Sequence, residues 1–310
     1  MSQAAGASWG GFRAPFALPV ARIWFTGLDK EQRSALESSY PAYVDSTHRG
    51  SGRGDEELEC RALRLDTPPG LPIAALTRDG QYAPQTVARP EGIDVIGLNF
   101  QARVPLHPSC EPGWLRVARA DELVQPVVME NFLRVFTAHQ ALRRGGVVLH
   151  SAGLVVGARA YLFAGRSGAG KTTLTRKGHA AGAGVLSDDI NLVLPGARGY
   201  QAHAVPFTGE FGRTLAHPGG RAAYPVAGLV LLERGERLAV APIRASTAIA
   251  RLLVACPFVN MEAATSAPLF DALTGLVARL PVVALRCRRE DAFDDIMSAV
   301  TEGFAHARAA

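Results

Sequence analysis

The residues with the clearest chemistry in this chain form the segment Gly165-Arg166-Ser167-Gly168-Ala169-Gly170-Lys171-Thr172. This segment matches G-x-x-x-x-G-K-[ST] at every position, follows an apolar run at 161–164 and opens a predicted helix, which is the context that the motif requires. Glycines allow successive backbone N–H groups to face one phosphate, and the positive end of the helix adds to this attraction. The plainer alternative is a glycine-rich turn that caps a helix and binds nothing.

The side chains of this loop predict a magnesium nucleotide as its ligand. Lys171 suits the outer phosphates, the hydroxyl of Thr172 suits magnesium, and Thr173 extends the phosphate-binding set. Lysine is rare in the chain, since only Lys30, Lys171 and Lys177 occur, so a lysine at this motif position is informative. The motif alone does not separate a kinase from an ATPase or a GTPase. No guanine-specifying N-K-x-D segment is present, and for that reason we expect ATP and Mg²⁺.

A pair of acids, Asp188 and Asp189, follows the loop. The fifteen residues between Thr172 and Asp188 allow a helix of about ten residues that runs about 15 Å away from the phosphates, and a short strand that returns. One carboxylate is then suited to hold magnesium while the other accepts a proton from an attacking hydroxyl. The alternative is that the pair caps a turn in solvent.

The elements that must position these residues indicate an α/β protein with a mixed sheet and two parts. Residues 1–120 form a strand-rich N-terminal region with one helix at Asp29–Ser38 and a glycine-rich loop at 46–55. Residues 121–310 form the nucleotide-binding domain with a leading helix at 121–144, whose true start is open between Asp121 and Pro126. We expect a hairpin before the loop, with its turn at Gly157-Ala158. The strands expected in the two parts are 22–26, 58–65, 73–77, 93–100, 147–149, 154–156, 161–164, near 185, 191–194, 229–232, 238–240 and 282–286, and the later helices are 171–181, 246–254, 266–280 and 291–304.

Composition narrows the class of protein. With 310 residues, 48% of them hydrophobic, the chain can bury a substantial core. The net charge of +5 comes from arginines spread along the chain, without a basic stripe, so we expect no nucleic-acid partner. No signal peptide and no apolar run long enough to span a membrane is found, and we expect a cytoplasmic protein without a membrane partner. The four scattered cysteines indicate free thiols, and homo-oligomer formation is left open.

These residues resemble the kinase domain of HPr kinase/phosphorylase and of the HPr-kinase-like proteins, which are related in fold to PEP carboxykinase. The resemblance covers about residues 145–290. It implies a mixed-sheet P-loop kinase domain of the HPr kinase/PEP carboxykinase type. Its elements are Leu149-His150 at a strand end, the loop from Gly165 to Thr173, Asp188-Asp189, Pro206-Phe207-Thr208-Gly209-Glu210, and Leu280-Pro281-Val282 leading to Arg286.

The resemblance also implies roles for individual residues. Asp188 would be the general base and Asp189 a magnesium ligand beside Thr172, with Lys171 acting on the phosphates. The remaining implied roles are His150 as a modulator of the proton affinity of Asp188, Glu210 as a further metal-side acid, and Arg286 as a phosphate contact. Without the resemblance, the plainer alternatives are an ordinary strand histidine for His150 and surface residues for Glu210 and Arg286.

The resulting prediction is an ATP- and Mg²⁺-dependent kinase that phosphorylates a serine-like hydroxyl on a small molecule, a peptide or a protein. The chain lacks the Glu-x-Arg-Gly-x-Gly signature of the true HPr kinases, so the acceptor stays open. A nucleotide-binding regulatory or assembly protein with weak ATPase activity is the alternative. A third possibility, lyase or carboxykinase chemistry, needs further metal and oxyacid ligands that the sequence does not reveal.

Overall fold

The computed structural model describes residues 6–44, 56–66, 77–78, 81–82, 84–215, 223–260 and 263–309. The chain divides into two compact units, Met1–Gln140 and Ala141–Ala310. The division falls near the end of the long helix α2 (Pro126–Arg143), whereas the sequence analysis placed it before that helix. Most of α2 goes with the first unit because its buried face packs there, with the rings of Phe132 and Phe25 5.6 Å apart.

The first unit is built on one seven-stranded sheet in the order β1-β2-β3-β9-β8-β7-β6. Strands β2, β3 and β9 are parallel neighbours, and the other pairs are antiparallel. Alternate residues of the central strands are buried, which gives the sheet one core face. The bounds are β1 Phe12–Ala17, β2 Arg22–Leu28, α1 Lys30–Ser39, β3 Glu57–Arg64, β4 Thr77–Arg78, β5 Gln81–Tyr82, β6 Gln85–Arg89, β7 Gly92–Gly97, β8 Phe100–Val104, β9 Gly113–Val117 and η2 Ala120–Glu122.

The sequence predictions for the helices and strands of this unit can be compared with the structure. The predicted helix at 29–38 is confirmed, because Asp29 and Gln32 form a reciprocal capping box at the start of α1. The predicted strand 93–100 is wrong in its extent. It is split into β7 and β8 by a tight turn in which Asn99 adopts a positive φ of 64°. The predicted loop 46–55 and most of the predicted strand 73–77 lie outside the described residues.

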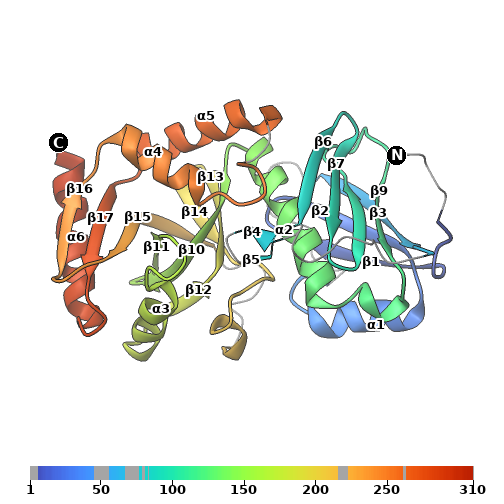
Figure 1. Cartoon of the computed structure of the whole chain (residues 1–310), viewed down its shortest axis with the longest axis horizontal. Coiled ribbons are helices and arrows are strands. Elements are labelled where there is room, and N and C mark those ends of the chain that lie inside the picture. The colour runs from blue at the N-terminus through green and yellow to red at the C-terminus, as the bar shows by residue number, and fades with distance from the viewer. Residues whose placement is uncertain are drawn as a thin grey trace. The chain divides into compact units, whose positions relative to one another are not determined.

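The second unit contains a closed ring of five strands (Figure 1). Its strands follow the order β11-β10-β13-β14-β15, and β15 closes the ring by pairing in parallel with β11. Strand β17 continues the sheet from β15, β16 follows β17, and β12 pairs with β10. The bounds are β10 Val147–Val156, β11 Arg159–Ala164, α3 Lys171–Ala180, β12 Gly184–Ser187, β13 Ile190–Gly196, β14 Gly199–His203, η3 Gly212–Thr214, β15 Ala223–Arg234, β16 Ala239–Pro242, α4 Ala245–Val254, α5 Ala263–Arg279, β17 Val282–Cys287 and α6 Phe293–Ala309.

The predicted α/β class with mixed strand directions is confirmed for this unit, and the hairpin before the loop is also confirmed. Strands β10 and β11 meet at Gly157-Ala158, where both residues adopt positive φ values of 55° and 62°. Helix α6 covers β16 and β17, with Val300 and Phe304 in a core shared with Val283. Neither the ring nor β14 was predicted, because a period-two pattern identifies a strand but not its partner.

Candidate functional site

The phosphate loop, residues 165–172, joins β11 to α3 as the motif predicts. Gly168 and Gly170 adopt φ values of 74° and 106°, a region that L side chains rarely enter. Gly165 is required for packing, because a Cβ there would lie 2.7 Å from the carbonyl oxygen of Leu232 on β15. The backbone of the loop is therefore held against the neighbouring parallel strand, at the carboxyl edge where ligands of α/β proteins bind.

The start of α3 is open toward a cavity. Gly170 is the N-cap and, among the described residues, no side chain caps the helix, so the N–H groups of its first turn face outward from the helix. A Cβ added to Gly170 would meet no described atom within 4 Å. Free N–H groups at the positive end of a helix bind anions. A phosphate group therefore fits this place by space and by charge.

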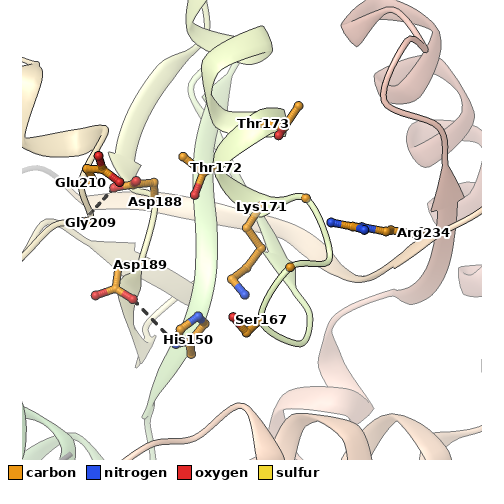
Figure 2. A pocket seen from close by; sticks show the side chains of 12 residues that line it. His150, Ser167, Lys171, Thr172, Thr173, Asp188, Asp189, Gly209, Glu210 and Arg234 are labelled. Carbon is orange, nitrogen blue, oxygen red and sulfur yellow. Dashed lines mark hydrogen bonds and ion pairs between the residues drawn. The ribbon is translucent and has the colours of Figure 1, made fainter. Parts of the chain in front are cut away.

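The cavity has a volume of about 450 Å³ and brings most of the predicted site residues together (Figure 2). Two of its lining residues, Gly209 and Arg234, were not predicted. The lining residues are His150, Ser167, Gly168, Gly170, Lys171, Thr172, Thr173, Asp188, Asp189, Gly209, Glu210 and Arg234.

The side chain of Lys171 is buried inside the phosphate loop. Its Nζ donates hydrogen bonds to the carbonyl oxygens of Gly165, at 2.7 Å, and Arg166, at 3.2 Å. Burial lowers the pKa of Lys171 from its ordinary value, and the nearby charge of Asp189 partly opposes this effect. A buried ammonium group held only by carbonyl oxygens would gain from a phosphate that completes its charge pairing.

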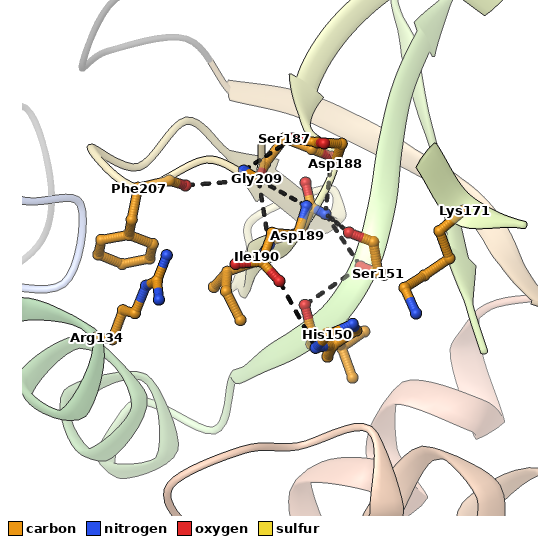
Figure 3. Close-up of polar contacts among 12 residues, drawn as sticks. Arg134, His150, Ser151, Lys171, Ser187, Asp188, Asp189, Ile190, Phe207 and Gly209 are labelled. Carbon is orange, nitrogen blue, oxygen red and sulfur yellow. Dashed lines mark hydrogen bonds and ion pairs between the residues drawn. The ribbon is translucent and has the colours of Figure 1, made fainter. Parts of the chain in front are cut away.

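Asp188 is almost fully buried and is bound by what we call the clasp loop, residues 207–212. Its Oδ1 accepts from the backbone N–H groups of Gly209, at 2.8 Å, and Gly212, at 3.1 Å, while its Oδ2 accepts from Phe211 at 3.2 Å. A Cβ on Gly209 or Gly212 would lie within 2.7 Å of this carboxylate, so both positions require glycine. Figure 3 shows the contact between Asp188 and Gly209. Both oxygens of Asp188 are thus engaged in holding a loop.

The carboxylate of Asp189 lies near His150 and not near the clasp loop. Strand β12 ends at Ser187, whose Oγ accepts from the backbone N–H groups of Asp189 and Ile190 at 3.2 and 3.1 Å. This tight connection directs the two neighbouring carboxylates apart. The Oδ1 of Asp189 lies 3.7 Å from Nδ1 of His150, which sits opposite Ile190 in the β10–β13 register. Both side chains are partly exposed to the cavity (Figures 2 and 3).

The remaining predicted residues divide into three groups. Gly165, Arg166 and Ala169 belong to the phosphate loop but do not line the cavity. Glu210 lines it beside Gly209, at the tip of the clasp loop. Arg286 lies on β17, outside the cavity, where its Nε is 3.1 Å from a carboxylate oxygen of Glu233.

Arg234 is the basic residue that sequence reasoning missed. It ends β15, the strand that pairs in parallel with β11. The signal in the sequence was a pair of charged residues, Glu233 and Arg234, directly after a long buried run at 226–232. The signal could be interpreted only with the knowledge that β15 pairs with β11, the strand before the phosphate loop. That pairing is a feature of the tertiary structure.

The part of the chain that contains the cavity residues also matches a known protein family. The model of the family described as SynChlorMet cassette protein ScmC matches residues 117–302, more than half of the chain. The chain belongs to the ScmC family. The match includes the phosphate loop, both acids, the clasp loop and Arg234. No curated protein matches the chain.

The predicted membership of the HPr-kinase-like family is therefore wrong, because the matching family is ScmC and no kinase family matches. The resemblance rested on a phosphate loop followed by paired acids. Phosphate chemistry favours that combination in more than one family, so the combination does not identify one. The roles that the resemblance implied for Asp188, His150, Glu210 and Arg286 now depend on the geometry of this chain alone.

Within the described part of the chain, no three histidine, cysteine, aspartate or glutamate side chains are grouped to hold a metal ion. No helix among the described residues is long and apolar enough to cross a membrane.

Proposed function

We propose that this protein is an ATP- and Mg²⁺-dependent phosphotransferase with a P-loop, and that it phosphorylates a hydroxyl group. The observation that carries the proposal is that a single cavity is lined both by groups suited to bind phosphate and by a carboxylate suited to accept a proton. An anion cradle with Lys171 lies on it, and so does the partly exposed carboxylate of Asp189 beside His150. A cradle alone would support binding, whereas a carboxylate facing the same cavity supports proton transfer from an acceptor.

The residues present fit a magnesium nucleotide. Mg²⁺ in such sites is usually held by one or two protein oxygens together with substrate phosphates. Thr172 and Glu210 both line the cavity and would supply those oxygens. When bound, the metal would neutralise charge on the phosphate oxygens. The backbone N–H groups of the loop and Lys171 would hold the polyphosphate chain.

The geometry favours Asp189 over Asp188 as the base. Three backbone N–H groups already occupy the carboxylate of Asp188, and their loss would release the clasp loop. Asp189 is more exposed and lies beside His150, a second group able to take a proton or to stabilise the charged carboxylate. We therefore assign the base to Asp189 and the anchoring role to Asp188, whereas the resemblance implied Asp188 as the base and Asp189 as a magnesium ligand.

In the proposed reaction, the acceptor oxygen attacks the terminal phosphorus of ATP. The bond from that phosphorus to the bridging oxygen breaks, ADP leaves with the electron pair, and the hydroxyl proton passes to Asp189. Positioning and electrostatic stabilisation supply most of the rate in such transfers. The acceptor class within this scheme is a hydroxyl on a small molecule, a peptide or a protein.

The test uses ATP labelled in its γ-phosphate, with purified protein, Mg²⁺ and separate panels of acceptors. The panels contain free serine and threonine, small polyols, and mixed peptides rich in serine and threonine. We expect label to appear in one panel and to disappear with Asp189→Asn. Label found only as free phosphate would favour the regulatory protein with weak ATPase activity. Absence of Mg²⁺-dependent nucleotide binding would reject both functions.

A further inference from the structure

Strand β11, which leads into the phosphate loop, has a different neighbour on each side. The two neighbours place different side chains near the loop. Strand β10 pairs with β11 on one side and carries His150, and both β12 and β13, which flank the acid pair, pair with β10. Strand β15 pairs with β11 on the other side and ends in Arg234. The carboxylates and Arg234 therefore approach the loop from opposite sides, as Figure 2 also shows.

Arg234 lies against the middle of the phosphate loop. The parallel register pairs Leu231 with Ala164, the last residue of β11, so Arg234 extends three residues farther, alongside the loop. The position that a Cβ would take on Gly168 is 3.8 Å from a terminal nitrogen of Arg234. Since Gly168 carries no side chain, the guanidinium group has open access to whatever the loop holds.

The charge of Arg234 is available for a ligand. Its neighbour Glu233 is engaged elsewhere, with Arg251 at 2.6 Å and Arg286 at 3.1 Å. Within the part of the chain that the structure describes, Arg234 forms no ion pair of its own, and its side chain is exposed. An arginine beside a phosphate cradle, without a carboxylate partner, is suited to bind a phosphate and to stack on a planar ring.

From this arrangement we infer that Arg234 binds the nucleoside end of the nucleotide, its α-phosphate and base, and not the phosphoryl group that is transferred. The inference rests on the proposed function, which puts the terminal phosphate at Asp189. A nucleotide laid along the loop from that side must point its nucleoside toward β15. Thr173, which lines the cavity from the first turn of α3, is the second group at this end (Figure 2). Arg234 is thus a nucleotide-binding residue at the nucleoside end of the cavity.

The test measures the dissociation constants of ATP and ADP by titration calorimetry with Mg²⁺, for the full chain and for Arg234→Ala. The α-phosphate and the base are common to both nucleotides. We therefore expect both affinities to fall by the same factor, roughly ten- to a hundredfold for one charged contact. The matched control is Arg237→Ala, an exposed arginine in the connection between β15 and β16, which should leave both affinities unchanged.

Each other outcome has a defined meaning. A loss for ATP without a loss for ADP would overturn the inference, because Arg234 would then contact the terminal phosphate. Unchanged affinity for both nucleotides would overturn it as well. Arg234→Lys keeps the charge but not the plane, so it should recover only part of the loss, and full recovery would reject the stacking contact. Failure to find any acceptor would reject phosphoryl transfer while leaving these affinities intact, so the two proposals fail separately.

Discussion

Two loops of the second unit present backbone N–H groups that suit an anion, and they differ in whether the chain itself supplies that anion. The clasp loop, residues 207–212, closes around the carboxylate of Asp188, which belongs to the same chain. The phosphate loop, residues 165–172, has no internal carboxylate in its cradle among the described residues and opens onto the cavity. Both depend on glycine, the first for close approach and the second for backbone angle.

The contrast indicates which loop is built for a ligand. A cradle that contains its own anion is complete when the chain folds, and its energy contributes to stability. A cradle without one leaves N–H groups and the buried Lys171 to be satisfied by an external anion. The same contrast separates the two acids, because Asp188 is occupied by the clasp loop and Asp189 is directed to the cavity.

The largest expected effect is on catalysis, and it tests the role of Asp189, the acid that is directed to the cavity. Asp189→Asn keeps the shape of the side chain but cannot take the hydroxyl proton. We expect the transfer rate to fall roughly 100- to 10,000-fold, the usual contribution of a positioned base, with little change in ATP affinity. Single-turnover transfer and calorimetry measure the two quantities. An Asp189→Asn protein with normal transfer would remove Asp189 from the mechanism.

The second effect is on stability, and it tests the role of Asp188, the acid that is bound by the clasp loop. Asp188→Asn replaces one accepting oxygen with a donor and leaves at least one buried N–H of the clasp loop without an acceptor. We expect a local loss of about 3 kcal/mol. All three tryptophans precede residue 115, so their fluorescence does not follow this unit. Hydrogen exchange of the amides of Gly209, Phe211 and Gly212 is the appropriate measurement.

Asp189→Asn is the matched control for this stability measurement, since it alters the neighbouring carboxylate by the same chemistry. Its clasp-loop amides should exchange as slowly as those of the unaltered protein. Equal acceleration in the two variants would mean that the acids do not have separate roles.

A smaller effect concerns nucleotide affinity at the phosphate loop. Lys171→Met keeps most of the aliphatic stem and removes the charge, so we expect ATP to bind roughly ten- to a hundredfold more weakly. Lys177→Met is the control, because Lys177 lies on the same helix and its Nζ bonds instead to the carbonyl oxygens of Arg289 and Asp291. Loss of affinity in the Lys177 variant alone would contradict the assignment.

The smallest effect is a pH dependence of binding. Burial lowers the pKa of Lys171, so its charge is lost at a lower pH than for an ordinary lysine, and the attraction for phosphate is lost with it. ATP affinity should therefore fall as the pH rises through this lowered pKa, with proton uptake on binding. Because the charge of Asp189 raises the pKa of Lys171, Asp189→Asn should move the fall to lower pH.

Calorimetry at a series of pH values below the ordinary pKa of lysine, about 10.4, in two buffers of different ionisation enthalpy, measures the affinity and the proton uptake together. Lys171→Arg is the control, because a guanidinium group stays charged over this range and should give a flat profile. A profile for the unaltered protein as flat as that of the arginine variant would contradict the proposed contact with phosphate.

Sequence patterns predicted the local elements well where a cap, a turn or a motif accompanied the periodicity. The helix that follows Asp29, the turn at Gly157 and the helix start at Lys171 are examples, because each depends on contacts between residues close in the chain. The family assignment failed for the opposite reason. It took a combination of motifs that phosphate chemistry imposes in general as a mark of one family.

The sequence by itself determined the phosphate loop, because the order of glycines, lysine and threonine specifies both the backbone angles and the charge of the cradle. It also predicted that two acids return to the loop, since the fifteen residues between Thr172 and Asp188 leave room for a helix leading away and a short strand leading back. Only the tertiary structure decided which acid is occupied, that Arg286 lies outside the cavity, and that Arg234 lies beside the loop. Those facts depend on strand partners and on contacts of the clasp loop about twenty residues away, and no local pattern encodes them.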